Sequence, residues 1–353
     1  MMKYSMKNTI ILLFLITICN KSFAGKPDSL LNYFEDLKTR TLLVCLQTES
    51  AKTVEKFTKK GDLKELELYR NGIKSTNTNL MNAVKLFWKL NSNIKFIPVD
   101  SLDWFKTNFP KKYGYLTLSS ADIHSAGAIH VGIENVPSFS RLGLHLFLCD
   151  QKRSIAYSNF PNDEIGQDIP KELKENNVLY SNYYLSSSKF IYALYRIDWF
   201  YKDLIKGIRP WMGSRNAINS GGLEDITAYN IKNKILVARL QDCEKGFDLE
   251  KAKKYYPYKI QIVSDEEFEK CMMNKNPEMI CFFVGLVSSS SMGGGGATMT
   301  KLIYMQQAIN CNDGIISTGF AGSFGLNYKV LEGFIDIMER NEKMKQKNAQ
   351  KNK

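Results

Sequence analysis

The sequence predicts an α/β fold made of two similar units in tandem, each with a mixed β-sheet, covering helices, a β-hairpin and a closing helix. Three observations support this prediction. Apolar runs of strand length alternate with amphipathic helical stretches, the same order of elements occurs twice, and each half ends in a strongly periodic helical segment. Such alternation is typical of sheets covered by helices.

The first half, residues 25–210, starts its strand pattern with an apolar run and continues through a long helical insert at 48–93. Within the insert, Leu80, Val84 and Phe87 form an apolar stripe that we interpret as core packing. Apolar runs and their punctuation predict the other elements. In order, these are strands at 42–47, 94–99 and 113–118, a short helix at 102–107, a hairpin of 142–150 and 154–158, and a closing helix at 188–206.

The second half, residues 211–342, repeats this order with a shorter first connection. Asn310, Asn312 and Gly314 favour a tight turn in its hairpin. The expected elements are strands at 235–240, 259–263 and 280–287, a short helix at 268–273, a hairpin of 302–308 and 314–318, and a closing helix from Asn327. The repeated order indicates a tandem duplication.

Residues 1–24 have the pattern of a secretory signal peptide. Lys3 and Lys7 precede an apolar run at 9–19, and small residues lead to an expected cleavage site after Ala24. The run has 11 residues, fewer than the roughly 20 that span a bilayer. Lipid attachment at Cys19 is a weaker alternative, because a bulky residue precedes it. We therefore expect a bacterial protein exported to the periplasm or the medium.

The formal net charge of +12 is unevenly distributed. Three lysines belong to the signal segment, and residues 343–353 carry five lysines and no acid, which leaves +4 for the body. We expect this tail to be disordered, with peripheral contact to anionic surfaces as an open alternative. Because the excess is a tail rather than a patch, we expect no nucleic-acid partner.

Residues 94–150 and 259–313 each run strand, short helix, strand and hairpin, with Asp150 and Asp313 at the end of the first hairpin strand. This order resembles the amino-terminal α/β domain of TolB, shared in outline by CsgG-like envelope proteins. The chain differs by its helical insert and by the absence of the TolB propeller. The resemblance implies an envelope binding or assembly module.

The three histidines, His124, His130 and His145, lie near Asp122 in the sequence. Imidazoles and a carboxylate could hold zinc, so these four residues are weak metal candidates. The six-residue spacing of the first two, in an expected loop, defines no ligand geometry. We interpret them first as loop or sheet-face histidines, and we expect no cofactor.

Residues 288–297 (SSSSMGGGGA) follow a predicted strand, as phosphate-binding loops do, but lack the Gly-Lys-Ser/Thr ending. We interpret the segment as a flexible loop, equivalent to the histidine loop of the first half. Ligand sites favour the carboxyl ends of strands in open α/β sheets. The ligand-binding hypothesis therefore names His124, His130, Ser289, Ser290, Gly293 and Gly294.

Six cysteines follow the signal segment, too few for a disulfide scaffold. Three lie in apolar runs and are expected as buried thiols: Cys45, Cys149 and Cys281. The better disulfide candidates are Cys243, Cys271 and Cys311. Residues 186–189 (SSSK) fit a Ser-x-x-Lys pattern, which we interpret as a helix cap because no Lys-Thr-Gly accompanies it.

These features favour an exported binding or assembly protein without catalytic activity, with an envelope protein or a surface polymer as its partner. The alternative is a secreted enzyme, metal-dependent or a hydrolase, that uses the region of His124, His130 and His145.

Overall fold

A computed structural model of the chain describes residues 27–123, 139–161, 185–207, 231–292, 298–322 and 325–351, and it confirms the α/β class. The helices are α2 (Pro27–Thr39), α3 (Ala51–Lys60), α4 (Leu63–Phe87), α5 (Leu102–Asn108), α8 (Ser187–Ile205), α10 (Leu249–Ala252), α11 (Asp265–Met273) and α12 (Tyr328–Lys351). The strands are β1 (Thr41–Leu46), β2 (Ile94–Pro98), β3 (Tyr113–Ile123), β4 (Phe139–Leu148), β5 (Ala156–Asn159), β6 (Ile235–Arg239), β7 (Ile260–Val263), β8 (Met279–Met292), β9 (Thr298–Asn310) and β10 (Ile316–Gly322).

The strands form two five-stranded mixed sheets. Sheet 1 has the order β2-β1-β3-β4-β5, and sheet 2 has the order β10-β9-β8-β6-β7. In sheet 1, β1 pairs in parallel with β2 and β3, and β4 and β5 continue the sheet antiparallel. In sheet 2, β6 pairs in parallel with β7 and β8, and β9 and β10 continue it antiparallel. Followed from β2 and from β7, the two sheets have the same order and the same pairing directions.

Equivalent backbone hydrogen bonds anchor the two hairpins. The amide of Cys149, just after β4, donates to the Tyr113 carbonyl at 3.1 Å. The amide of Cys311, just after β9, donates to the Met279 carbonyl at the same distance. Because Tyr113 and Met279 are the first residues of β3 and β8, the two cysteines occupy equivalent places in their sheets.

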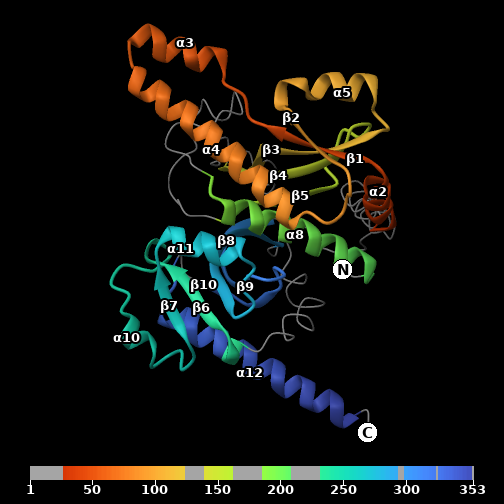
Figure 1. Cartoon of the computed structure of the whole chain (residues 1–353). Coiled ribbons are helices and arrows are strands. Elements are labelled where there is room, and N and C mark those ends of the chain that lie inside the picture. Colours follow the sequence, from red (N-terminus) through yellow and green to blue (C-terminus); the bar gives the residue numbers. More distant parts are fainter. Residues whose placement is uncertain are drawn as a thin grey trace, which may run out of the picture.

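Helices and sheets alternate in layers, and α8 lies between the two sheets (Figure 1). Helices α2 and α4 share this middle layer on the side of sheet 1, and α11 shares it on the side of sheet 2. Helix α5 packs on the outer face of sheet 1. Helices α10 and α12 pack on the outer face of sheet 2.

Helix α8 is apolar on nearly every side, which is the pattern of a helix buried all round. Its core joins Leu116 and Leu144 of sheet 1 to Cys281 and Phe283 of sheet 2. The largest hydrophobic core therefore spans both halves of the chain. Among the described residues, no helix has the combination of length and apolar character needed to cross a membrane. The buried residues of α8 are Ser187, Ser188, Phe190, Ile191, Tyr192, Ala193, Leu194, Tyr195, Ile197, Tyr201, Asp203 and Leu204.

Helix α12, by contrast, has a single apolar face. The side chains of Val330 and Phe334 are buried against sheet 2, whereas those of Lys329, Glu332 and Asp336 are exposed. A polar outer face is what the last helix of a stack of layers requires.

The expected disordered tail is wrong for residues 343–351, because α12 continues to Lys351. Lys, Gln, Met and Ala in this stretch are good helix formers. Lys232 also donates to Glu342 at 3.0 Å, and Lys343 lies 3.9 Å from Glu339 one turn earlier. The basic end of the chain is therefore a helical extension in this part.

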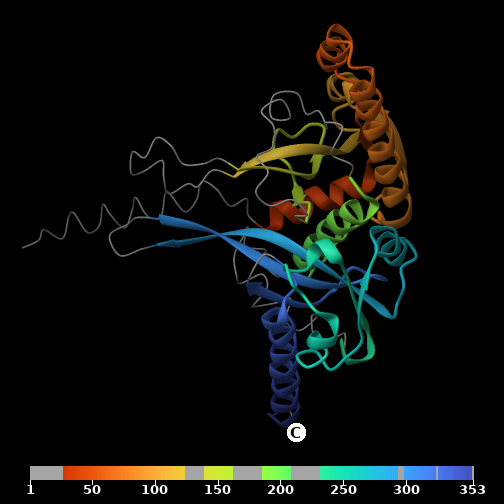
Figure 2. The ribbon, with the colours of Figure 1, turned by 90° about the vertical axis from the view of Figure 1, so that its left-hand side faces the viewer.

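The hairpins β3–β4 and β8–β9 run out of the body on the same side (Figure 2). Strand β8 continues to Met292, and β9 begins at Thr298. The loop expected at 288–297 is therefore wrong for residues 288–292, which belong to β8. Backbone pairing with β9 extends the strand although serine is a weak strand former.

Candidate functional site

The structure describes two of the six residues of the ligand-binding hypothesis. Ser289 and Ser290 lie within β8, paired with Lys301 and Thr300 of β9, so their assignment to a loop is wrong. The other four residues lie outside the described parts of the chain: His124, His130, Gly293 and Gly294.

The weak metal cluster does not form between its two described members. Asp122 of β3 pairs with Ser140, whereas His145 of β4 pairs with Thr117. Five residues of strand separate these two positions, which is roughly 17 Å at 3.4 Å per residue. Proximity in the sequence was misleading here, because both residues lie on long extended strands. Within the described ranges, no three His, Cys, Asp or Glu side chains are grouped to hold a metal ion.

Rings from four elements instead form two groups of ring contacts that share one apolar cluster on the outer face of sheet 1, and together we call them the aromatic band. Helix α5 and strands β3, β4 and β5 each contribute. The residues of the aromatic band are Trp104, Phe105, Phe109, Tyr113, Tyr115, His145, Phe147 and Tyr157.

Strand register explains the centre of the aromatic band. Tyr115 lies directly opposite Phe147, and their stacked rings have centroids 4.7 Å apart. His145, two residues before Phe147, lies opposite Tyr157 of β5, with ring centroids 5.5 Å apart. Stacked cross-strand rings of this kind stabilise a sheet and make its surface rigid.

The ends of the aromatic band are exposed and its centre is not. Trp104 is 57% exposed and Tyr157 is 50% exposed, whereas Tyr115 and His145 are buried. Large exposed rings beside a buried apolar patch are a common feature of binding surfaces.

His145 is the one imidazole in the band. Its Nε2 is buried and has no hydrogen-bond partner in the described parts of the chain. Burial lowers the pKa of this imidazole below its usual 6.5, so the ring is neutral at pH 7. A neutral and unpartnered imidazole nitrogen can take part in one more hydrogen bond, and a docked group reaches it here once the side chains that bury it move aside.

The thiols near the band are not activated for catalysis. Burial raises the pKa of Cys45 to about 12 and that of Cys149 to about 11. A nucleophilic cysteine needs a lowered pKa, because the thiolate is the reactive form. These thiols therefore act as small apolar side chains in the sheet, as predicted.

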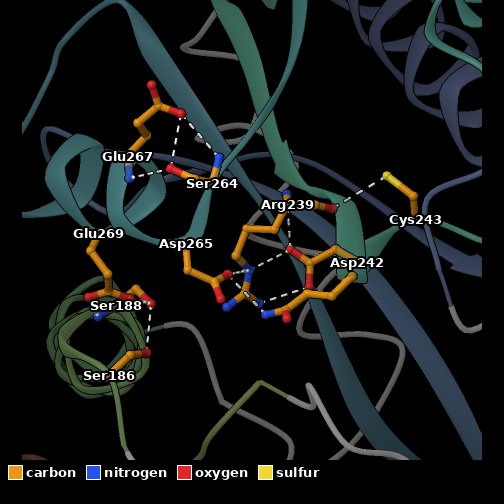
Figure 3. A network of polar contacts seen from close by, with 10 residues as sticks. Ser186, Ser188, Arg239, Asp242, Cys243, Ser264, Asp265, Glu267 and Glu269 are labelled. Atoms are coloured by element: carbon orange, nitrogen blue, oxygen red, sulfur yellow. Dashed lines mark hydrogen bonds and ion pairs between the residues drawn. The ribbon is translucent and has the colours of Figure 1, made fainter.

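A second polar cluster lies at the carboxyl ends of β6 and β7 (Figure 3). The Arg239 guanidinium donates through Nε and Nη2 to the Asp242 carboxylate, both at 2.8 Å, and its Cζ lies 4.8 Å from the Phe268 ring centroid. Gln241 donates to Asp265 at 3.1 Å beside this pair. Although strand ends of this kind often bind ligands, the pair is buried and mutually neutralised. We interpret this contact, which we call the structural joint, as one that stabilises the packing of α11 at the ends of β6 and β7.

The Ser-x-x-Lys segment takes part in the same joint, which Figure 3 shows beside α11. The amide of Ser188 donates to Glu269 Oε2 at 2.7 Å, and the Ser188 hydroxyl donates to the same carboxylate. Glu269 therefore caps the first turn of α8, where a negative charge is favourable. Ser186 occupies the predicted N-cap position of α8, but its side chain makes no capping hydrogen bond, and Glu269 satisfies this end of the helix instead.

The two aspartates of the TolB-like pattern have different roles. Asp150 accepts from Arg40 at 2.9 Å, and this hydrogen bond holds the pKa of the carboxyl below its ordinary value. Asp313 accepts from the amide of Ile315 at 3.0 Å within its own turn. The shared residue type thus does not indicate a shared site.

In comparisons with known proteins, no family model, curated protein or solved structure matches the chain.

Sequence reasoning missed the aromatic band, because its rings come from elements up to 53 positions apart and only the sheet brings them together. A usable signal was present. Tyr113 and Tyr115 alternate along one predicted strand, and His145 and Phe147 alternate along another, which indicates one aromatic face on each.

Proposed function

We propose that the protein is a non-catalytic binding or assembly protein of the cell envelope, and that the aromatic band docks an amphipathic helix of a partner protein. The single observation that carries this proposal is the unpartnered Nε2 of His145 at the buried centre of the band. A buried polar atom without a hydrogen bond is costly, and a docked side chain can supply the missing partner.

Sheet 2 offers an internal precedent for such docking. Counted from the equivalent Cys149 and Cys311, the residue that corresponds to His145 is Gln307. Gln307 Oε1 accepts a hydrogen bond at 2.9 Å from the Tyr192 hydroxyl of α8, a helix of the other half. The same place on sheet 2 is thus covered by a helix with a hydroxyl donor. We infer a helix of similar chemistry for sheet 1.

A second copy of the chain fits this surface less well. In the first half, α8 follows sheet 1 and covers sheet 2. Helix α12 follows sheet 2 in the same way, so in a pair of copies α12 of one copy would cover the aromatic band of the other. Its outer side chains Lys329, Glu332 and Asp336 are charged and exposed. Charged groups are depleted at the centres of stable interfaces, so a different protein is the better occupant.

The envelope location rests on the expected signal segment at residues 1–24 and on the TolB-like order of elements. The equal strand orders and equivalent hairpin anchors support the inference that the two units arose by duplication. After a duplication, the inner face of sheet 2 is covered by α11 and α8, whereas α5 is the described helix that covers the equivalent face of sheet 1.

Site-specific photocrosslinking tests the proposal. A photoreactive phenylalanine analogue is placed at Tyr157 or Trp104, and the full chain is exposed to the envelope fraction of its own cells. We expect one adduct, joined at both positions to a peptide with an amphipathic helical pattern and a hydroxyl-bearing side chain. Leu63, which is 68% exposed on α4, is the matched control position and should give no such adduct.

Two further results decide the question. Tyr157→Ala and Trp104→Ala should each weaken binding of the identified peptide about tenfold, whereas Leu63→Ala should not. Adducts only with a surface polymer, or adducts of equal yield at Leu63, would refute helix docking at the aromatic band.

A further inference from the structure

Two cysteines meet in the core between α8 and sheet 2. Cys281 lies in β8, and Cys311 follows directly after β9, the antiparallel neighbour of β8. Cys281 pairs with Ile309, so Cys311 is its diagonal neighbour across the two strands. Their Sγ atoms are 3.2 Å apart, and neither residue is exposed to solvent.

The separation of the two sulfur atoms is already shorter than an ordinary non-bonded contact. A disulfide requires about 2.05 Å, so the two atoms have to approach by roughly 1 Å, which small side-chain rotations can provide. Cys281 is buried, as expected from its apolar run, and its contact gives the disulfide candidate Cys311 a possible partner.

The remaining cysteines provide internal comparisons. Cys149 is the equivalent of Cys311 in sheet 1, but the place of Cys281 is taken there by Tyr115. Cys271 of α11 is partly exposed, and its Sγ lies 3.1 Å from the Met279 Sδ. Cys45 and Cys149 of the first unit share one apolar cluster, and the thiol contact at 3.2 Å belongs to the second unit.

We propose that Cys281 and Cys311 form a disulfide bond in the mature protein. The bond forms by exchange with an oxidised disulfide, either that of a protein oxidant or glutathione disulfide. The new bond joins the Sγ atoms of Cys281 and Cys311, and the disulfide of the oxidant breaks. The two cysteines give up two electrons and two protons, and the oxidant leaves as two thiols. This proposal does not depend on the docking function of the aromatic band.

The bond would fix the surface on which α8 packs. The Tyr195 hydroxyl of α8 donates to the Cys311 carbonyl at 3.0 Å. A link between Cys311 and Cys281 joins this turn to the middle of β8 and closes a loop across 30 positions of the chain. Loops of this length gain substantial stability when they are closed.

Burial also indicates when the bond forms. It raises the pKa of the Cys281 thiol well above its ordinary value, so the folded protein holds little thiolate at this place. Because the thiolate is the attacking species, exchange is slow once α8 covers the sheet. We therefore expect oxidation while the chain folds.

The test is a refolding experiment on the full chain. Reduced, unfolded protein is refolded in a mixture of glutathione and glutathione disulfide. The refolded protein is then unfolded in denaturant that contains N-ethylmaleimide, so that buried free thiols are blocked, and the digest is analysed by mass spectrometry without reduction. We expect one linked pair of peptides, containing Cys281 and Cys311, with Cys45 and Cys149 blocked. Reduction should separate the pair and lower the melting temperature by about 5 °C.

Variants separate the alternatives. Cys281→Ser and Cys311→Ser should each remove the linked pair, and their melting temperatures should not change on reduction. Cys271→Ser is the matched control and should leave the bond intact. Recovery of natively folded protein with Cys281 and Cys311 both blocked, or with Cys311 linked to Cys271, would overturn the proposal.

Discussion

At the scale of single residues, His145 links the stability of the fold to pH. The unfolded chain binds a proton at this imidazole near pH 6.5, whereas burial lowers the pKa in the folded protein. The unfolded state therefore holds more protons below this value, and its free energy falls relative to that of the folded state. The contribution of neutral His145 is complete above pH 6.5 and is lost as the pH falls toward the lowered pKa.

His145→Gln introduces the residue that occupies the equivalent place in sheet 2. We expect the free energy of unfolding of this variant to fall less between pH 7 and pH 5 than that of the natural protein. Urea titrations at several pH values measure the difference, and the other histidines cancel because both proteins contain them. Equal slopes would show that His145 does not titrate as its burial requires.

Arg239 and Asp242 form the other decisive contact at this scale, because both side chains are only 6% exposed. Arg239→Ala should lower the free energy of unfolding by about 3 kcal/mol, since it leaves a buried carboxylate without its counter-ion. Chemical denaturation measures this loss. Lys270→Ala removes an ion pair on the exposed face of α11 and should leave the denaturation midpoint unchanged. Similar midpoints for the two variants would contradict the structural role of the joint.

At the scale of elements, the turn after β9 depends on its contact with α8. Gly314 has a φ of +73°, and a Cβ placed there would overlap the Tyr195 ring. Gly61, at the end of α3, has a φ of +69° and open space around it. The two glycines therefore share a left-handed backbone but differ in their surroundings.

Gly314→Ala should cost about 3 kcal/mol of stability, from backbone strain together with overpacking against the ring. Gly61→Ala should cost about 1 kcal/mol, from backbone strain alone. Thermal or urea unfolding of the two variants gives the comparison. Gly314→Ala should cost less in a Tyr195→Ala background than in the natural protein, because the ring that it overlaps is absent there. Equal effects of the two glycine variants would argue against the packing of α8 on this turn.

Periodicity in the sequence predicted α8 and both hairpins within a few residues, and it predicted the insert at 48–93 as helical without dividing it into α3 and α4. Local patterns succeed where burial on one face determines the residue types, as in α12. They failed at Ser288–Ser291, where pairing with β9 extends the strand beyond what serine favours. They also failed for the aromatic band and for the Cys281–Cys311 contact, because both depend on which strands become neighbours.

At the scale of the whole molecule, α8 belongs to both units. The boundary expected at residue 210 separates it from sheet 2, although Phe283 and Ile309 pack in the same core as α8. A fragment of residues 211–353 would expose this apolar face of sheet 2.

We expect the fragment of residues 211–353 to aggregate or to bind a hydrophobic dye strongly. The longer fragment of residues 185–353, which retains α8, should bind less dye and elute closer to its monomer volume. Size-exclusion chromatography with dye fluorescence measures both properties. A monomeric, cooperatively unfolding 211–353 fragment would show that sheet 2 does not need α8.

The place of α8 in the chain also determines the order in which the two sheets can assemble during synthesis. The chain emerges from its amino terminus, and α8 precedes every strand of sheet 2. The first unit can therefore assemble before the second has been delivered, and it then presents a ready-made surface on which later strands condense. The dependence runs in one direction only: a damaged first unit deprives the second of its template, whereas a chain interrupted after α8 still contains every strand of sheet 1.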